Sequence, residues 1–365
     1  MKLLILACES EAGQTDAAKA LREEAARQGH EALIRDPFAW LEKRGDGEEK
    51  KRRKSAFSRR VERMADATPL TAPFLFSNAK YAESFLREVR EEGYGAILAI
   101  HPYAMEAVSA TVRRGETLPP AYGVFTDYAL PAIFRAAELT GYFLPHWTMT
   151  EDLAAKGILR EKLIPVGVPA SRRLSEPMEK EAARNFLVLP RDLGFYLIFA
   201  EGMSAGNVSR ILDEILARAP EKTLVTVMAG RQSEERDELA ARYAGESRVQ
   251  VSATPERIDV YLSAGDVLIM RPDGFLASEA ALAGIPTVLY PALPGTVDAK
   301  NADFFAAREM ALKAQSARDA ARKAERLVLD RAQRERIEVM QKRGSVRAAA
   351  GEIIREAAAE RGKSE

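Results

Sequence analysis

A glycine-bearing loop, Gly202–Gly206, has the residue types that bind an anion. It reads GMSAG and lies between a predicted strand at 195–200 and a predicted helix at 207–218. Glycines at a helix N-terminus let backbone N–H groups approach a diphosphate, and the helix dipole favours the negative charge. A plain tight turn is the alternative interpretation. The residues expected to bind phosphate here are Gly202, Ser204, Gly206 and Asn207.

The same loop also matches the G-x-S-x-G elbow that carries the nucleophilic serine of α/β-hydrolases. That chemistry needs a histidine after the serine in the chain. The three histidines are His30, His101 and His146, and all of them precede Ser204. The order of residues therefore excludes this hydrolase arrangement.

A second candidate loop reads RPDG at Arg271–Gly274. It follows a predicted buried strand at 267–270 and precedes a predicted helix from about 276 to 282. Glu279, one turn into this helix, could accept hydrogen bonds from ribose hydroxyls, as acidic residues do in other nucleotide folds. A carboxylate in this place can also simply complement the helix dipole. The residues expected to bind ligand here are Arg271, Gly274, Ser278 and Glu279.

Two further strand ends belong to the same predicted site. A strand at 223–228 is closed by Ala229-Gly230-Arg231, and a strand at 287–290 runs into a Pro/Gly loop that ends at Gly295. Ligands of parallel sheets bind at the carboxyl ends of the strands. We therefore add Arg231 and Gly295 to the residues expected to bind a nucleotide.

The elements that position these loops are short apolar strands alternating with helices, which indicates parallel sheets covered on both faces. The first half opens with a strand at 2–8, a helix at 16–28 with Asp16 as its N-cap, and a strand at 30–35. The loop at 9–15 holds one glycine, so it is neither a dinucleotide fingerprint nor a P-loop. Asp127 follows a later strand. The remaining strands of this half are predicted at 94–100, 121–126, 141–144 and 162–166.

Length and composition favour two globular domains. The chain has 365 residues, which exceeds the roughly 250–300 at which single cores stop growing. Lys and Arg number 54 and so do Asp and Glu, so no global field favours nucleic acid as a partner. Cys8 is the single cysteine, which excludes an internal disulfide and a cysteine-based metal site.

The first residues, MKLLILACESEAG, have an apolar core too short for a signal peptide, and acidic residues follow at once. We interpret them as a first strand. Uncharged apolar runs stay below the ~18–20 residues that span a membrane. The expected location is cytoplasmic, with peripheral attachment to the inner face of the cell membrane.

A basic insertion near 42–63 interrupts the α/β pattern. Ten basic and four acidic residues lie between Lys43 and Arg63. Anionic membranes attract such segments by about 1 kcal/mol per Lys or Arg near the surface. Phe38 and Trp40 beside Lys50–Arg60 would suit interfacial binding. The alternative is a solvated helical insertion.

Several motifs now occur in the order and spacing of one family. The sequence resembles the GT-B glycosyltransferases. Within them it resembles the branch of plant monogalactosyldiacylglycerol synthases, bacterial processive diacylglycerol glucosyltransferases and the N-acetylglucosaminyltransferase that forms lipid II. The similarity runs from Met1 to about Leu312. The matching motifs are VFTDY at 124–128, YFLP at 142–145, GVP at 167–169, GMSAG at 202–206, RPDG with SEA between 271 and 280, and PG with Asn301 between 294 and 301.

The resemblance implies an α/β GT-B fold, with two Rossmann-like domains facing a cleft and a C-terminal helix packing back toward the N-terminal domain. It places the acceptor domain at 1–169, the nucleotide-sugar donor domain at 170–313 and a helical tail at 314–365. It further implies inverting transfer of a sugar, usually from a UDP-sugar, to a lipid acceptor such as diacylglycerol. The family uses no bound metal, and we expect no other cofactor.

Some catalytic and donor positions depart from the family pattern. The family's first loop, G-A-G-H, reads EAGQ here. Gln14 cannot act as a general base, because an amide has no useful basicity near neutral pH. The resemblance then favours Asp127 as the base, with Glu9 or Glu11 as alternatives. Further departures are Met203, Asp273 and Thr296.

Two other functions stay open at this point. The departures are those expected of a catalytically silent GT-B protein that acts as a binding or regulatory module. A sugar-nucleotide epimerase of the same fold is the second alternative, and it would need no acceptor and no basic insertion.

Overall fold

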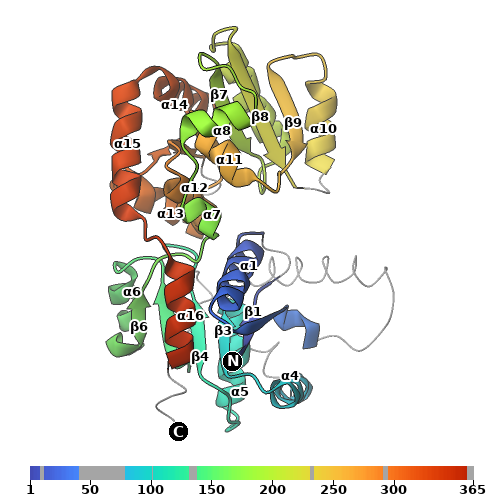
Figure 1. Ribbon diagram of the computed structural model, residues 1–365, viewed down its shortest axis with the longest axis vertical. Helices are drawn as coiled ribbons and strands as arrows, with labels where there is room; N and C mark the ends of the chain where they lie inside the picture. The colour runs from blue at the N-terminus through green and yellow to red at the C-terminus, as the bar shows by residue number, and fades with distance from the viewer. Residues whose placement is uncertain are drawn as a thin grey trace. The chain divides into compact units, whose positions relative to one another are not determined.

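The computed structural model describes residues 1–8, 12–40, 79–100, 102–130, 138–230, 234–290 and 295–359. The chain divides into two compact units. Unit 1 comprises Met1–Ser171 and Ala348–Glu365, and unit 2 comprises Arg172–Arg347. Figure 1 shows the elements of both.

Unit 1 contains a six-stranded parallel sheet in the order β2-β1-β3-β4-β5-β6. Its strands are short and apolar, and Leu3–Leu6 of β1 are fully buried because helices cover both faces of the sheet. β2 pairs with one edge of β1, and β3 pairs with the other edge, on which all later strands are added. The strands are β1 (Lys2–Leu6), β2 (Glu31–Arg35), β3 (Ala96–Ala99), β4 (Ala121–Val124), β5 (Gly141–Leu144) and β6 (Leu163–Pro165).

The helices of unit 1 fill one large core cluster, which includes Phe85, Met105 and Leu153. The prediction that Asp16 caps the first helix is wrong. That helix already begins at Ala12, and Asp16 lies inside it, where its carboxylate pairs with Lys19 at 2.7 Å. The helices are α1 (Ala12–Arg27), α4 (Ala79–Glu92), α5 (Pro102–Val112), α6 (Met149–Ala155) and α16 (Ala349–Ala359), with 3-10 turns η1 (Pro37–Trp40) and η2 (Arg160–Lys162).

The last helix, α16, returns to unit 1 and packs against α1 (Figure 1). Gln28 Nε2 donates to the Gly351 carbonyl at 3.0 Å. Ile353, Ile354 and Ala357 are buried on the packed face. The predicted C-terminal helix that folds back toward the N-terminal domain is thereby confirmed.

Unit 2 contains a second six-stranded parallel sheet in the order β12-β11-β10-β7-β8-β9. The two-residue edge strand β12 was not predicted, because so short a segment carries no periodic signal. The strands are β7 (Gly194–Phe199), β8 (Thr223–Ala229), β9 (Val249–Ala253), β10 (Val267–Met270), β11 (Thr287–Leu289) and β12 (Leu312–Lys313).

Further helices of unit 2 precede its first strand and follow its last strand in the sequence. The segment 172–186 forms α7 and α8, and α14 and α15 supply Ala320, Leu327 and Ile337 to the core of unit 2. The helices are α7 (Arg172–Ser175), α8 (Lys180–Phe186), α9 (Ala205–Leu216), α10 (Glu234–Arg242), α11 (Ile258–Ala264), α12 (Gly274–Ala283), α13 (Val297–Ala307), α14 (Ala317–Leu329) and α15 (Arg331–Gly344).

Candidate functional site

The strand order of unit 2 fixes where a ligand would bind. Counted from β7 as the first strand, the order from β9 to β12 is 3-2-1-4-5-6. In such doubly wound sheets, ligands bind outside the carboxyl ends of the strands at the point where the order reverses. Here that point lies between β7 and β10. The loops that follow these two strands are 200–204 and 271–273, and both were predicted from sequence as nucleotide-binding loops.

The first of these loops leads into helix α9. Ser204 is its N-cap, with extended backbone, and Ser204 Oγ accepts a hydrogen bond from the Asn207 N–H at 3.3 Å. The hydroxyl therefore satisfies one helical N–H and keeps its own proton for a ligand. Gly206 lies in the first turn, where an added Cβ would meet no atom within 4 Å. Met203, a departure from the family pattern, is buried in the core and does not occupy the loop's outer surface.

Gly202 has a structural role that the sequence did not reveal. Its φ is +72°, which favours glycine, and a Cβ at this position would lie 2.7 Å from Nε of Arg271 and 3.0 Å from its Cζ. The guanidinium of Arg271 thus lies close against Gly202, in the space that a Cβ would fill. The two predicted loops are in direct contact, and the glycine is required for that contact.

Arg271 also pairs with two carboxylates. Its Nη2 lies 3.6 Å from Oδ2 of Asp273, and its Nη1 lies 3.4 Å from Oδ2 of Asp298. Asp273 additionally caps helix α12, because its Oδ1 accepts from the Leu276 N–H at 3.0 Å. The family departure at Asp273 is therefore a helix N-cap whose charge is paired.

Helix α12 is buried along most of its length. Glu279 is 8% exposed and Ser278 Oγ donates to the Gly274 carbonyl at 2.7 Å. The helix is apolar all round, as expected of a helix enclosed by the protein. The predictions that Ser278 and Glu279 contact a donor remain predictions.

Helix α13 brings a third N-terminus to this sheet. Gly295 has a φ of +83°, and Thr296 Oγ1 accepts from the Ala299 N–H at 3.3 Å as the N-cap. The departure at Thr296 is thus also a cap. Asn301 is fully buried, and its Nδ2 donates to the Pro272 carbonyl at 3.1 Å. This bond ties α13 to the loop of Arg271.

Asp298, in the first turn of α13, was missed by sequence analysis. A carboxylate there looks like ordinary complementation of a helix dipole. Its side chain is 17% exposed. Burial raises the pKa of the Asp298 carboxyl above its usual range; Arg271 opposes this shift and Asp273 adds to it. Its partner, Arg271, lies 27 positions earlier in the chain, so no local sequence pattern indicates the pair.

In unit 1, two predicted catalytic residues lie at carboxyl ends of strands. Gln14 is in the first turn of α1, which follows β1, and its Oε1 accepts weakly from the Cys8 N–H at 3.4 Å. Asp127 follows β4 and is half-buried. Strand β3 lies between β1 and β4, so these strand ends are roughly 10 Å apart, which is two strand spacings.

Other predicted residues fall outside the described part of the chain. These are Glu9, Glu11, Arg231, the side chain of Phe38 and the basic run at 50–60. Trp40 is described, and its indole packs edge-on against Phe85 with ring centroids 5.1 Å apart. Its Nε1 also donates to Glu88 at 3.0 Å. The predicted membrane contact through Trp40 stays a prediction.

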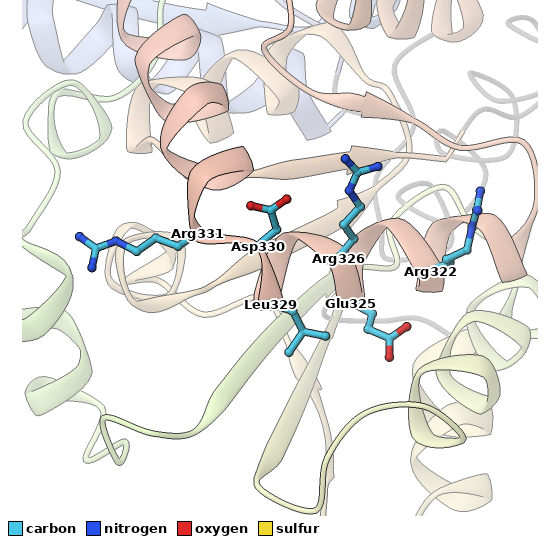
Figure 2. Close-up of a pocket in the computed structure, with 6 residues that line it drawn as sticks. All are labelled: Arg322, Glu325, Arg326, Leu329, Asp330 and Arg331. Atoms are coloured by element: carbon cyan, nitrogen blue, oxygen red, sulfur yellow. The ribbon is translucent and has the colours of Figure 1, made fainter.

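A pocket of about 680 Å³ lies on α14 and the start of α15, apart from the loops that follow the strands. Figure 2 shows Arg322 and Arg326 pointing to one side of α14 and Glu325 and Leu329 to the other. Arg322 pairs with Asp319 at 2.8 Å. The side chains that line this pocket do not converge on one point. We therefore place the candidate site at the switch point of the sheet in unit 2.

Within the described ranges, no group of three or more His, Cys, Asp or Glu side chains is arranged to hold a metal ion. In the same part of the chain, no helix is both long enough and apolar enough to cross a membrane.

The sequence of this chain is similar to a known family and to several known enzymes. The family model described as monogalactosyldiacylglycerol (MGDG) synthase matches residues 15–170. A processive diacylglycerol beta-glucosyltransferase of Bacillus licheniformis is 26% identical over 219 residues, which cover 59% of this chain and 56% of the relative. The matched part therefore spans a little over half of that relative's length.

Solved structures resemble the whole chain. The crystal structure of Acinetobacter baumannii MurG has a TM-score of 0.58 at 14% identity and covers 98% of this chain and 99% of its own. The UDP-GlcNAc 2-epimerase of Neisseria meningitidis, bound to UDP-GlcNAc, has a TM-score of 0.65 at 11% identity with the same coverage. At these identities the likeness shows the fold. Together, the family model, the relative and the solved structures confirm the predicted resemblance to the diacylglycerol glycosyltransferase branch of the GT-B superfamily.

Proposed function

We propose that this protein is a hexosyltransferase that moves a sugar from a nucleotide sugar, most suitably a UDP-sugar, to the hydroxyl of a lipid such as diacylglycerol. The observation that carries this proposal is the switch point of unit 2. Three capped helix N-termini and Arg271 lie at the carboxyl edge of one doubly wound sheet.

The donor half of the proposal uses the chemistry of these loops. The N-terminus of α9 supplies backbone N–H groups and the Ser204 hydroxyl to the diphosphate, and helix dipoles favour its charge. Arg271 adds a cation for the charge that develops as the diphosphate leaves. Gly274, Ser278, Glu279 and Gly295 remain proposed donor contacts, and such a site needs no metal ion.

The acceptor half places Asp127 as general base. In an inverting step, Asp127 removes the proton of the acceptor hydroxyl while its oxygen attacks the anomeric carbon. The bond from that carbon to the diphosphate breaks, and the electron pair leaves with the diphosphate. Gln14 orients the acceptor by hydrogen bonding, since its amide cannot take the proton.

Contact with a membrane would bring the lipid to this edge. Trp147 is 65% exposed on the loop after β5, the strand next to β4. An exposed indole of this kind is suited to the interface between water and lipid. We propose that Trp147, together with the basic run at 50–60, rests on an anionic membrane surface.

The test is transfer by the purified protein from UDP-glucose or UDP-galactose to diacylglycerol in vesicles, followed by mass spectrometry of the lipid. We expect a glycolipid product and equimolar UDP. Binding of the UDP-sugar without any product identifies a silent binding protein instead. Conversion of the donor in the absence of lipid identifies an epimerase, and either outcome overturns the proposal.

A further inference from the structure

Arg271 connects three segments around the switch point. It follows β10, lies against Gly202 in the β7–α9 loop, and reaches Asp298 in the first turn of α13. The Arg271–Asp298 pair spans 3.4 Å, which is longer than the ~2.7–2.9 Å of a tight charge-assisted hydrogen bond. The pair is therefore an ion pair and not a tight hydrogen bond, close enough to orient the guanidinium.

The two carboxylates around Arg271 are not equivalent. Asp273 is committed to the cap of α12 through Oδ1. Asp298 pairs with Arg271 through Oδ2, and Asp273 does so through its own Oδ2. The two side chains are similarly buried, at 17% and 19% exposed, so the cap bond of Asp273 is what distinguishes them. Two negative charges thus face one positive charge, in the place where the proposed function puts a diphosphate.

We propose that Asp298 positions Arg271 over Gly202, and that Asp298 takes up one proton when a nucleoside diphosphate sugar binds at the switch point. This inference rests on the function proposed above. Phosphate oxygens compete for the guanidinium, and a mostly buried carboxylate beside them loses its counter-charge. Its ionised form is then disfavoured by desolvation and by like charge. The proton comes from solvent and forms an O–H bond on Asp298, and no other bond changes.

The charged groups around Asp298 favour the uptake of a proton. Arg271 and Asp273 are the charged groups that act on it from the neighbouring loop. Lys300 and Asp303, on its own helix, are exposed to solvent. The pKa of Asp298 is already raised by burial while Arg271 is beside it. Weakening the Arg271–Asp298 ion pair raises the pKa of Asp298 further. The protein with bound nucleotide sugar therefore holds more protons than the free protein.

The experiment is calorimetry of UDP-glucose and UDP-galactose binding at about pH 5.5 in two buffers of different ionisation enthalpy. These probes suit the test because a diphosphate esterified at both ends has no group that titrates in this range. We expect uptake of roughly one proton, and affinity that weakens by up to about tenfold per pH unit above the pKa of the free protein. Asp298→Asn should abolish both effects, whereas Asp303→Asn, an exposed aspartate of the same helix, should keep them.

The outcomes separate this inference from the function on which it rests. Donor binding without proton uptake between about pH 5 and about pH 8, or with equal uptake in Asp298→Asn, overturns the role of Asp298 alone. Failure of both sugars to bind overturns the proposed function as well. If Asp298→Asn does not fold, the absence of proton uptake by the unmodified protein still overturns the role of Asp298.

Discussion

The two sheets present their carboxyl edges very differently. In unit 2, Ser204, Asp273 and Thr296 cap three helices, and Arg271 links two loops and a helix. In unit 1, Gln14 and Asp127 follow strands that are separated by β3. The chain itself builds the geometry of the donor edge. At the proposed acceptor edge, Gln14 and Asp127 lie at the ends of strands that are two spacings apart, roughly 10 Å.

The largest expected effect concerns the acceptor edge alone. Asp127→Asn should lower kcat by about 100- to 10,000-fold, because the amide cannot remove the acceptor proton. The Kd for UDP-glucose or UDP-galactose should stay unchanged, since donor binding is assigned to unit 2. Steady-state kinetics and calorimetry measure the two quantities. A loss of donor affinity equal to the loss of rate would contradict the division of labour between the edges.

The next effect concerns the stability of unit 2. Arg184 is buried and donates to the carbonyls of Ala264, Pro190, Arg191 and Leu193 and to Oδ2 of Asp266. Arg184→Met removes this donor from the four carbonyls and from Asp266 Oδ2, while Asp266 keeps the Phe195 N–H on Oδ2 and Lys180 Nζ on Oδ1. We expect a loss of about 3–5 kcal/mol in the free energy of unfolding.

Arg191 provides the matched control for Arg184, because it is 80% exposed and pairs with Glu181. Arg191→Met should change the free energy of unfolding by less than about 1 kcal/mol. Denaturant unfolding measures both variants. Similar losses for the two would show that the burial of Arg184 does not decide its contribution.

A smaller effect follows from the contact between the donor loops. Gly202→Ala places a Cβ against the guanidinium of Arg271 and keeps a positive φ, at a cost of about 1–2 kcal/mol. Gly206→Ala adds a methyl group in open space within α9 and should stabilise the helix by about 0.5–1 kcal/mol. Thermal unfolding compares the two. Equal destabilisation would mean that Arg271 does not depend on Gly202.

The smallest effect is that of a cap. Asp273→Ala removes the acceptor for the Leu276 N–H and should destabilise unit 2 by about 1 kcal/mol. Asp273→Asn, which can still cap, should cost less. If both variants lose the same stability, the charge of Asp273 beside Arg271 matters more than its cap.

Sequence alone was sufficient for the α/β class, because buried apolar runs such as 267–270 mark interior strands of parallel sheets. It also located the loops at both strand ends of the switch point. It could not predict that Asp273 and Thr296 cap helices or that Met203 is buried in the core. In the sequence, each of these residues is only a departure from a family motif, and its residue type does not reveal its role. The Arg271–Asp298 pair needed the three-dimensional structure, because the pairing of β10 with β11 brings distant segments together.

The return of α16 to unit 1 has a consequence for biosynthesis. Unit 2 is continuous in sequence, whereas unit 1 is completed by residues from 348 onward. A ribosome releases the whole of unit 2 before the helix that covers α1. We therefore expect unit 2 to fold first during translation, with the face of α1 exposed until the last helix emerges.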